Sequence, residues 1–145
     1  ATQGWVKVSD MIHLTCNDLG ITLTEGIEEL TALVELDLNR NAISSIDLTA
    51  NTALTELSLN NNSLTNIDIS DNTGLSQVDL SRNQLTQLDS SNNAALELLN
   101  LLQNQISSLN LTNNTALNSL WLNNNQLNSN KRTKTATQNH HRVME

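Results

Sequence analysis

The strongest constraint on the fold of this chain is a repeat with a constant period of 21 residues. The stretch LTELSLNNNSLTNIDISDNTG, at 54–74, matches the residues before and after it when shifted by 21. Five copies begin at Leu33, Leu54, Leu75, Leu96 and Leu117. An earlier copy of 22 residues begins at Met11, and Leu19 stands there in place of a repeated asparagine. We therefore expect an array of about six coils, in which the first is a terminal coil.

Each coil carries two aliphatic pairs and two asparagine positions. The first asparagine ends an LxL segment, and we call these the strand-end asparagines: Asn41, Asn62, Asn83, Asn104 and Asn125. The second lies in the connection to the next coil, and we call these the return asparagines: Asn51, Asn72, Asn93 and Asn114. Asparagine tolerates left-handed backbone and bonds to neighbouring peptide groups. A structural role in turns, within and between coils, is therefore expected for them.

The LxL segment predicts a short strand with one buried face. Its side chains alternate, so Leu57 and Leu59 point one way while Glu56 and Ser58 point the other. One such strand cannot bury its leucines alone, but stacked parallel strands form continuous leucine columns. The absence of Phe, Tyr and Pro fits a core regular enough to be filled by aliphatic residues alone. The remaining residues of a coil are too few for a helix, which predicts extended or 3₁₀ returns and a fairly flat solenoid.

The pattern LxxLxLxxNxL, across residues 11–130, resembles the leucine-rich repeat family. The 21-residue coils, and the stretch HLTCNDLGITLTEGIEELTAL at 13–33, are similar to bacterial internalin-like proteins. The resemblance implies an α/β-type right-handed superhelix with a parallel β-sheet on one face and little helix. It also implies protein recognition, in a bacterial secreted or cell-surface setting. A cytoplasmic location stays open, because the sequence shows neither a sorting signal nor an anchor.

Three segments are expected along the chain. Residues 1–10, with Trp5, Val6 and Val8, form an N-terminal capping segment, and residues 11–130 form the solenoid. Residues 131–145 form a basic tail that is a poor cap for the last coil. The sequence leaves open whether this tail is ordered or disordered, and whether it is native or a remnant. The last coil would then expose its leucines and its sheet edge, which favours association.

Charge and composition exclude several function classes. Residues 1–130 hold 14 acidic and three basic side chains, which argues against binding to nucleic acid or to an anionic membrane. No apolar run is long enough to span a membrane. No catalytic constellation, phosphate loop or zinc pattern is present, so we expect neither an enzyme nor a cofactor or metal. Cys16 occupies a leucine column and is expected to be a buried thiol; a reactive thiol is the alternative.

A column of aspartates needs separate treatment. Asp47, Asp68 and Asp89 occupy equivalent positions on successive coils, and Asn110 follows them. Such a ladder could bind a cation through oxygen ligands. The favoured interpretation is that each aspartate caps a turn on a solvated face.

The outward-facing strand positions hold the candidate binding site. The first four coils are polar and mainly acidic there, and the last two carry large apolar residues. We define the apolar patch as Leu98, Leu102 and Trp121, since a tryptophan flanked by leucines is typical of binding hot spots. Cover by the tail and ordinary surface scatter are the alternatives. The remaining candidate residues are Asn100, Asn123, Glu35, Asp37, Glu56, Asp79 and Arg82.

The sequence therefore predicts a non-enzymatic protein-recognition module that uses the exposed sheet face. Its partner would be another protein or a second copy of the chain. The alternative is a structural, self-associating repeat protein that dimerises through the uncapped last coil or through Trp121.

Overall fold

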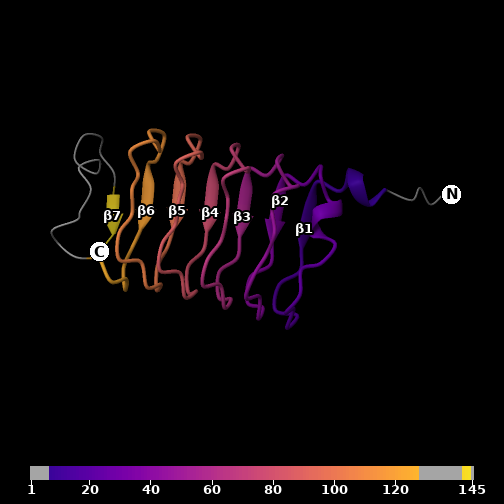
Figure 1. Cartoon of the computed structure of the whole chain (residues 1–145), viewed down its shortest axis with the longest axis horizontal. Coiled ribbons are helices and arrows are strands. Elements are labelled where there is room, and N and C mark those ends of the chain that lie inside the picture. The colour runs from indigo at the N-terminus through magenta and orange to yellow at the C-terminus, as the bar shows by residue number, and fades with distance from the viewer. Residues whose placement is uncertain (1–6, 128–141, 145) are drawn as a thin grey trace.

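The computed structural model describes residues 7–127 and 142–144, and it is a single parallel β-sheet closed into a solenoid by turns (Figure 1). The sheet has the order β1 to β7, so each strand pairs with the next one in the sequence. Every strand is three residues long: β1 is His13–Thr15, β2 Glu35–Asp37, β3 Glu56–Ser58, β4 Gln77–Asp79, β5 Leu98–Asn100, β6 Ser119–Trp121 and β7 Arg142–Met144. The predicted leucine-rich-repeat solenoid is confirmed.

The strand register follows the repeat in the sequence. Leu14 pairs with Leu36, 22 residues on, and Leu36 pairs with Leu57 after the regular 21. The middle residue of each strand from β2 to β6 points inward and is buried, while its two neighbours are intermediate or exposed. Stacking therefore places one leucine or valine of each coil in a continuous core column.

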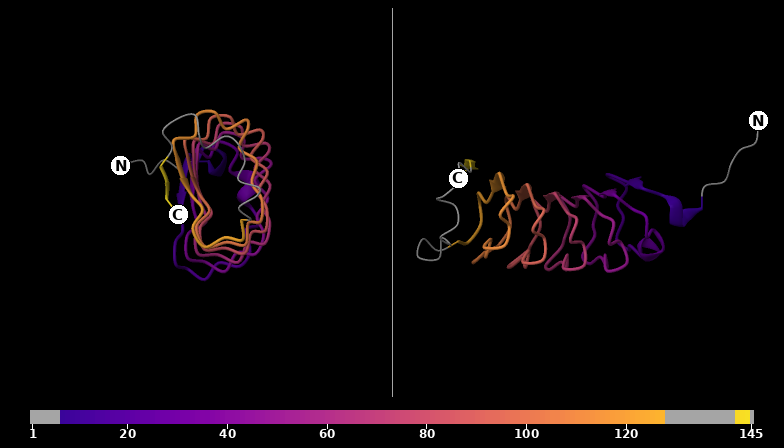
Figure 2. Two further views of the ribbon diagram at one scale, coloured as in Figure 1. Left: turned by 90° about the vertical axis from the view of Figure 1, so that its left-hand side faces the viewer. Right: turned by 90° about the horizontal axis from the view of Figure 1, so that it is seen from above.

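The returns are made of turns. In the third coil Asn72 N–H donates to Ile69 C=O at 3.1 Å, and Leu75 N–H donates to Asn72 C=O at 3.1 Å. Only the first coil has a 3₁₀ helix in its return, η2 at Ile27–Glu29, among the residues the structure describes. Without helices to widen one side, the coils stack along a nearly straight axis, with the sheet on one side of the ring (Figure 2).

The strand-end asparagines bind neighbouring coils together. Asn83 is 8% exposed, and its Nδ2 donates to Leu59 C=O at 2.9 Å and Leu80 C=O at 3.1 Å. Its Oδ1 accepts from Leu64 N–H at 3.0 Å. One amide thus satisfies peptide groups of two coils, and the same arrangement recurs along the ladder.

The return asparagines are more deeply buried and less completely bonded. Nδ2 of Asn72 donates to Leu48 C=O at 3.0 Å and to Asn51 C=O at 2.9 Å. Their Oδ1 atoms lack a partner in three coils: Asn51, Asn72 and Asn93. Asn114 differs, because Ser90 Oγ donates to its Oδ1 at 2.9 Å. The serine that weakens the aliphatic pattern of its coil therefore supplies a hydrogen bond that the other coils lack.

The residue before each strand-end position has left-handed backbone. In the six coils this residue has φ between 54° and 58°, and it is never glycine: Asp18, Arg40, Asn61, Arg82, Gln103 and Asn124. The turn that follows each strand therefore carries a conformational cost wherever the residue is not Asn or Asp.

The two ends of the solenoid differ. At the N-terminal end, η1 (Val8–Asp10) leaves Val8 58% exposed, and Trp5 and Val6 of the expected cap lie outside the described residues. At the C-terminal end, β7 pairs in parallel with β6, and Trp121 aligns with Met144. The prediction that the last coil leaves its sheet edge open is wrong, because three residues of the tail pair with that edge. The rest of the tail, 131–141 and 145, lies outside the described residues.

Candidate functional site

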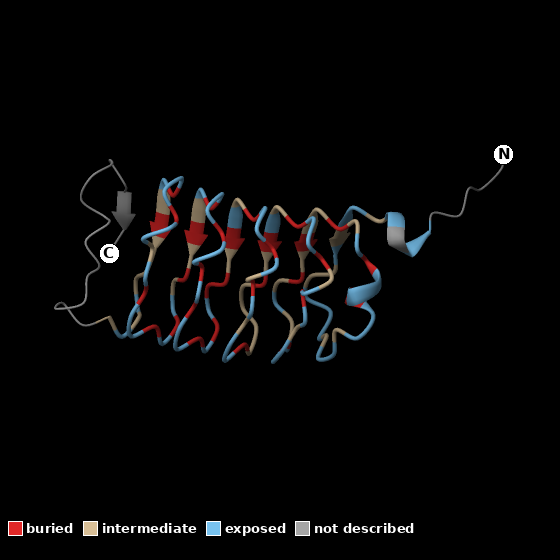
Figure 3. Cartoon of the chain, turned by 45° about the horizontal axis from the view of Figure 1, so that its top comes forward, coloured by how far each residue is buried: buried red, intermediate tan, exposed pale blue. Residues whose placement is uncertain are grey.

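The outward side of the sheet forms one long face along the solenoid, and the strands begin with exposed residues at β3 and β4 but with residues of intermediate exposure at β5 and β6 (Figure 3). Over β1 to β4 its side chains are polar: the strand-starting residues are His13, Glu35, Glu56 and Gln77. In β5 the strand-starting residue is Leu98, and in β6 the last residue of the strand is Trp121. The face therefore has a polar, acidic half and an apolar half.

The residues of the apolar patch are adjacent but half-buried. Trp121 pairs in register with Asn100, and Leu98 and Leu102 flank Asn100 in the sequence. All three patch residues have intermediate exposure, as does Asn123. Each is less open to solvent than the sequence suggested. The most exposed large aliphatics of the described chain lie elsewhere, in η1 and the first coil: Val8, Ile12, Leu19 and Leu23.

A shallow depression of about 270 Å³ runs across the face from β2 to β5. Its polar lining comes from Glu35, Asp37, Glu56, Ser58, Gln77 and Asp79, and Leu98 borders it at the apolar end. The depression therefore connects the acidic half of the face to the apolar patch.

Two of the four carboxylates on this face are held by the protein itself. Asp37 accepts from Asn17 Nδ2 at 2.8 Å through Oδ2, and from Asn39 N–H at 3.3 Å through Oδ1. Asp79 accepts from Ser81 N–H at 2.9 Å through Oδ1, and from Asn60 Nδ2 at 3.4 Å through Oδ2. Both oxygens of each aspartate are thus engaged in shaping the face.

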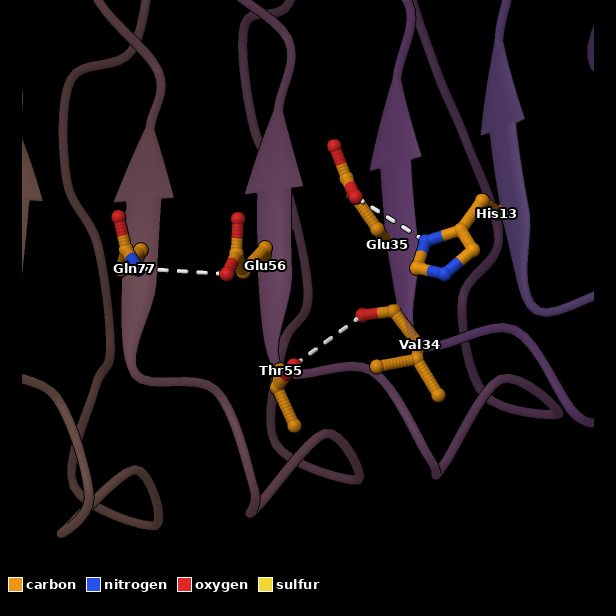
Figure 4. Close-up of polar contacts among 6 residues, drawn as sticks. All are labelled: His13, Val34, Glu35, Thr55, Glu56 and Gln77. Carbon is orange, nitrogen blue, oxygen red and sulfur yellow. Dashed lines mark hydrogen bonds and ion pairs between the residues drawn. The ribbon is translucent and has the colours of Figure 1, made fainter.

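Glu35 and Glu56, on neighbouring strands, are less constrained. Glu35 Oε2 contacts His13 Nδ1 at 3.0 Å, and Glu56 Oε1 accepts from Gln77 Nε2 at 3.3 Å (Figure 4). In each glutamate the other carboxylate oxygen points away from the residues drawn with it. These two side chains remain available to an external cation.

The cations of the face lie at the opposite end of the strands. Arg40 and Arg82 are exposed, in the turns that follow β2 and β4. His13, at the start of β1, lies with its Nδ1 3.0 Å from Glu35 Oε2. The strand starts are therefore negative, and the turns after the strands carry positive charge.

The aspartate column caps turns, as favoured from the sequence. Thr49 Oγ1 and N–H donate to Asp47 Oδ1 at 2.7 and 3.0 Å. These two bonds lower the pKa of Asp47 below its ordinary value, and the bond from the Thr49 hydroxyl has the larger effect. The Ser70 N–H has the same effect on the pKa of Asp68. Asn110 receives bonds of equal length from Thr112, so a neutral oxygen fulfils the same role.

Residues 7–127 hold no group of three metal-ligating side chains. Cys16 is partly buried and packs against the core, so it is more accessible than expected for a leucine column. Among the described residues, no helix has the length and hydropathy that a membrane span requires.

We compared the chain with known protein families, protein sequences and solved structures. No protein-family model and no curated protein sequence match the chain. Among solved structures, the functional domain of InlJ from Listeria monocytogenes, described as including a cysteine ladder, is 35% identical. It superposes with a TM-score of 0.80 over 83% of this chain. A leucine-rich-repeat protein of Leptospira interrogans is 25% identical, with a TM-score of 0.79 over 85% of this chain.

A third similar structure is the internalin InlF from Listeria monocytogenes, at 30% identity and a TM-score of 0.59 over 77% of this chain. The fold and its neighbours define the chain as a leucine-rich-repeat protein. More narrowly, its repeat is that of the bacterial internalin-like proteins. The chain spans 27%, 34% and 41% of the InlJ, Leptospira and InlF chains, respectively.

Proposed function

We propose that this chain is a non-enzymatic protein-recognition module that binds through the outward side of its sheet. The observation that carries the proposal is the apolar patch, Leu98, Leu102 and Trp121, on a face that is otherwise polar. Tryptophan is enriched among the few residues that supply most of the binding energy of an interface, and the apolar contacts around such a residue exclude water. Asn100 and Asn123 border the patch and would bond to the rim of a partner.

The decisive experiment is capture of a partner by three versions of the immobilised protein. The first is the parent chain, and the second carries Trp121→Ser with Leu102→Ser. The third carries Leu23→Ser, a matched control, because Leu23 is 72% exposed and lies in the first coil. We expect a protein that binds the parent and the control but not the patch variant. Equal capture by all three versions would remove the sheet face from the proposal.

Self-association is the second candidate, and one observation favours it. Large aliphatic side chains are exposed at the N-terminal end of the solenoid, including Ile12 at 49% and Leu19 at 66%. Light scattering across a concentration series would give the molar mass of the parent, the Leu19→Ser variant and the Trp121→Ser variant. A dimer lost on substitution of Leu19 supports contact through the first coil, whereas loss with Trp121 supports contact through the patch. A monomer throughout leaves both surfaces to a different protein.

A secreted or cell-surface location is proposed on the likeness to internalins. Fractionation of the source bacterium, followed by detection with an antibody against the chain, would test it. Recovery in the cytoplasmic fraction alone would contradict the proposal.

A further inference from the structure

We infer that the sheet face is a bipartite docking surface for a protein segment that is basic at one end and apolar at the other. Its lysine or arginine residues lie over β2 and β3, and its aliphatic or aromatic residues lie over β5 and β6. The inference rests on the proposed function and specifies the chemistry of the partner.

The basic end is assigned by the two available glutamates. Asp37 and Asp79 are already bonded through both oxygens to the protein's own amides. Glu35 and Glu56 each use one oxygen on an exposed neighbouring side chain, which a partner can displace at little cost. The charge that discriminates between partners therefore comes from the glutamates, while the aspartates fix the shape of the face.

The position of the glutamates strengthens this assignment. Glu35 and Glu56 are directly opposite each other in the register of β2 and β3. Like charges in such a pair repel and destabilise the sheet. A cation placed between them would be attracted by both carboxylates and would remove their repulsion. An anionic segment would add to that repulsion, which makes the pair selective for charge.

The apolar end of the segment is assigned from the strand-starting residues of β2 to β5, which change from glutamate to leucine along the sheet. The strand-starting residues in register are Glu35, Glu56, Gln77 and Leu98. Three strand spacings of about 4.8 Å separate Glu35 from Leu98, a span of about 14 Å, or roughly four extended residues. The depression bordered by these residues is continuous over that span. One short extended segment can therefore reach both halves.

The arginines define the orientation across the strands. Arg40 and Arg82 follow β2 and β4, about five residues beyond the strand-starting column, or roughly 15 Å away. They repel a cation that approaches the C-terminal ends of the strands. The basic part of the segment is therefore directed to the strand starts.

The test uses defined peptides and Trp121 as the reporter. The chain contains two tryptophans, so Trp5→Phe leaves Trp121 as the sole one. The probe is a capped ten-residue peptide in which two lysines precede two leucines by four residues, with serines elsewhere. One control peptide replaces the lysines with glutamates, and another replaces the leucines with serines. Binding is followed by Trp121 emission and by two-dimensional NMR, at 20 mM and 500 mM NaCl.

We expect the lysine–leucine peptide to bind more tightly than either control peptide. Glu35→Gln with Glu56→Gln should weaken it about tenfold in 20 mM NaCl and less than about twofold in 500 mM, since exposed charges are screened by salt. The matched control, Glu25→Gln with Glu29→Gln, removes the same charge from the return of the first coil and should have under about twofold effect. Leu102→Ser should weaken binding by about tenfold at both salt concentrations.

Three results would each overturn the inference. They are equal binding of the glutamate peptide, equal weakening by the two glutamine pairs, and no measurable binding of the lysine–leucine peptide. In these cases the proposed function is judged separately, by whether a captured partner is lost on substitution of Trp121 and Leu102.

Discussion

Removal of one strand-end asparagine gives the sharpest test of how the coils are held together. In Asn83→Ala, the buried Leu64 N–H loses the only acceptor that the structure gives it. An orphaned buried donor costs about 1–3 kcal/mol. The three bonds that Asn83 Nδ2 donates, to Leu59, Leu80 and Ser81 C=O, are lost as well. Leu59 C=O keeps Asn62 Nδ2 at 3.1 Å, and Leu80 C=O keeps Asn104 Nδ2 at 2.9 Å. Each of these three bonds adds about 0.5–1.5 kcal/mol, so the total cost is at least about 2.5 kcal/mol.

The assay is urea unfolding, followed by circular dichroism and by tryptophan emission. Coincidence of the two transitions justifies a single free energy of unfolding. The matched control is Asn66→Ala, because Asn66 is exposed and its one bond goes to Thr65 Oγ1 at 3.3 Å. The control should lie within about 0.5 kcal/mol of the parent. A cost below about 1 kcal/mol for Asn83→Ala, indistinguishable from the control, would refute the reasoning.

Pairs of substitutions test the sharing of carbonyls between neighbouring asparagines. Asn83 and Asn104 both donate to Leu80 C=O, so their double alanine variant leaves that oxygen without either donor. Its cost should exceed the sum of the single costs by about 0.5 kcal/mol or more. Asn62 and Asn104 share no carbonyl, and their costs should add. Equal coupling in both pairs would show that the bonds act independently of the ladder.

Three further predictions concern the turns and the returns. Asp68→Asn should leave thermal stability at pH 7 unchanged, since Asn110 fills the equivalent turn; below about pH 4 the parent should lose stability more steeply than the variant. The sign follows because folding lowers the pKa of the Asp68 carboxyl. Its ionised form therefore stabilises the fold above the pKa of the unfolded chain, and this stabilisation is lost as the pH falls through the pKa of the folded chain. Gln103→Gly should raise the free energy of unfolding by about 1 kcal/mol in urea titrations, because the residue has φ of 55°. Ser90→Ala should lower the free energy of unfolding by about 1 kcal/mol, since Asn114 Oδ1 loses its donor. An unchanged urea midpoint for Gln103→Gly or for Ser90→Ala would contradict the role assigned to that residue.

Much of the fold follows from the sequence because the repeat determines both period and register. The 22-residue spacing of the first coil and the 21-residue spacing of the later coils match the observed register, in which His13 pairs with Glu35 and Glu35 with Glu56. The role of the aspartate column was also predictable, since the bond from Thr49 N–H to Asp47 Oδ1 is local in the chain. Such features need only the alternation of a strand and the stacking of identical units.

The features that the sequence did not predict depend on contacts between unlike residues. β7 carries no part of the repeat, and its strand conformation comes from pairing with β6. The four acidic residues of the face looked alike in the sequence, but amides of neighbouring coils engage Asp37 and Asp79 and leave Glu35 and Glu56 available. Those amides are spaced by about one coil from the carboxylates, so only a structure reveals which side chain each one reaches.

The amide network also bears on how strongly such a flat face can bind. Asn39 links three coils, since its N–H donates to Asn17 Oδ1 at 2.6 Å and its Oδ1 accepts from Asn60 N–H at 2.8 Å. Side chains fixed in this way lose little further freedom on association, so less of the contact energy is spent on ordering them. A rigid floor of aspartate and asparagine side chains therefore lets a few outward residues, Glu35, Glu56 and Trp121, determine partner choice. Substitution of Asn39 by alanine should then weaken binding of the lysine–leucine peptide, although Asn39 makes no contact in the inferred complex, and an unchanged affinity would contradict this role of the network.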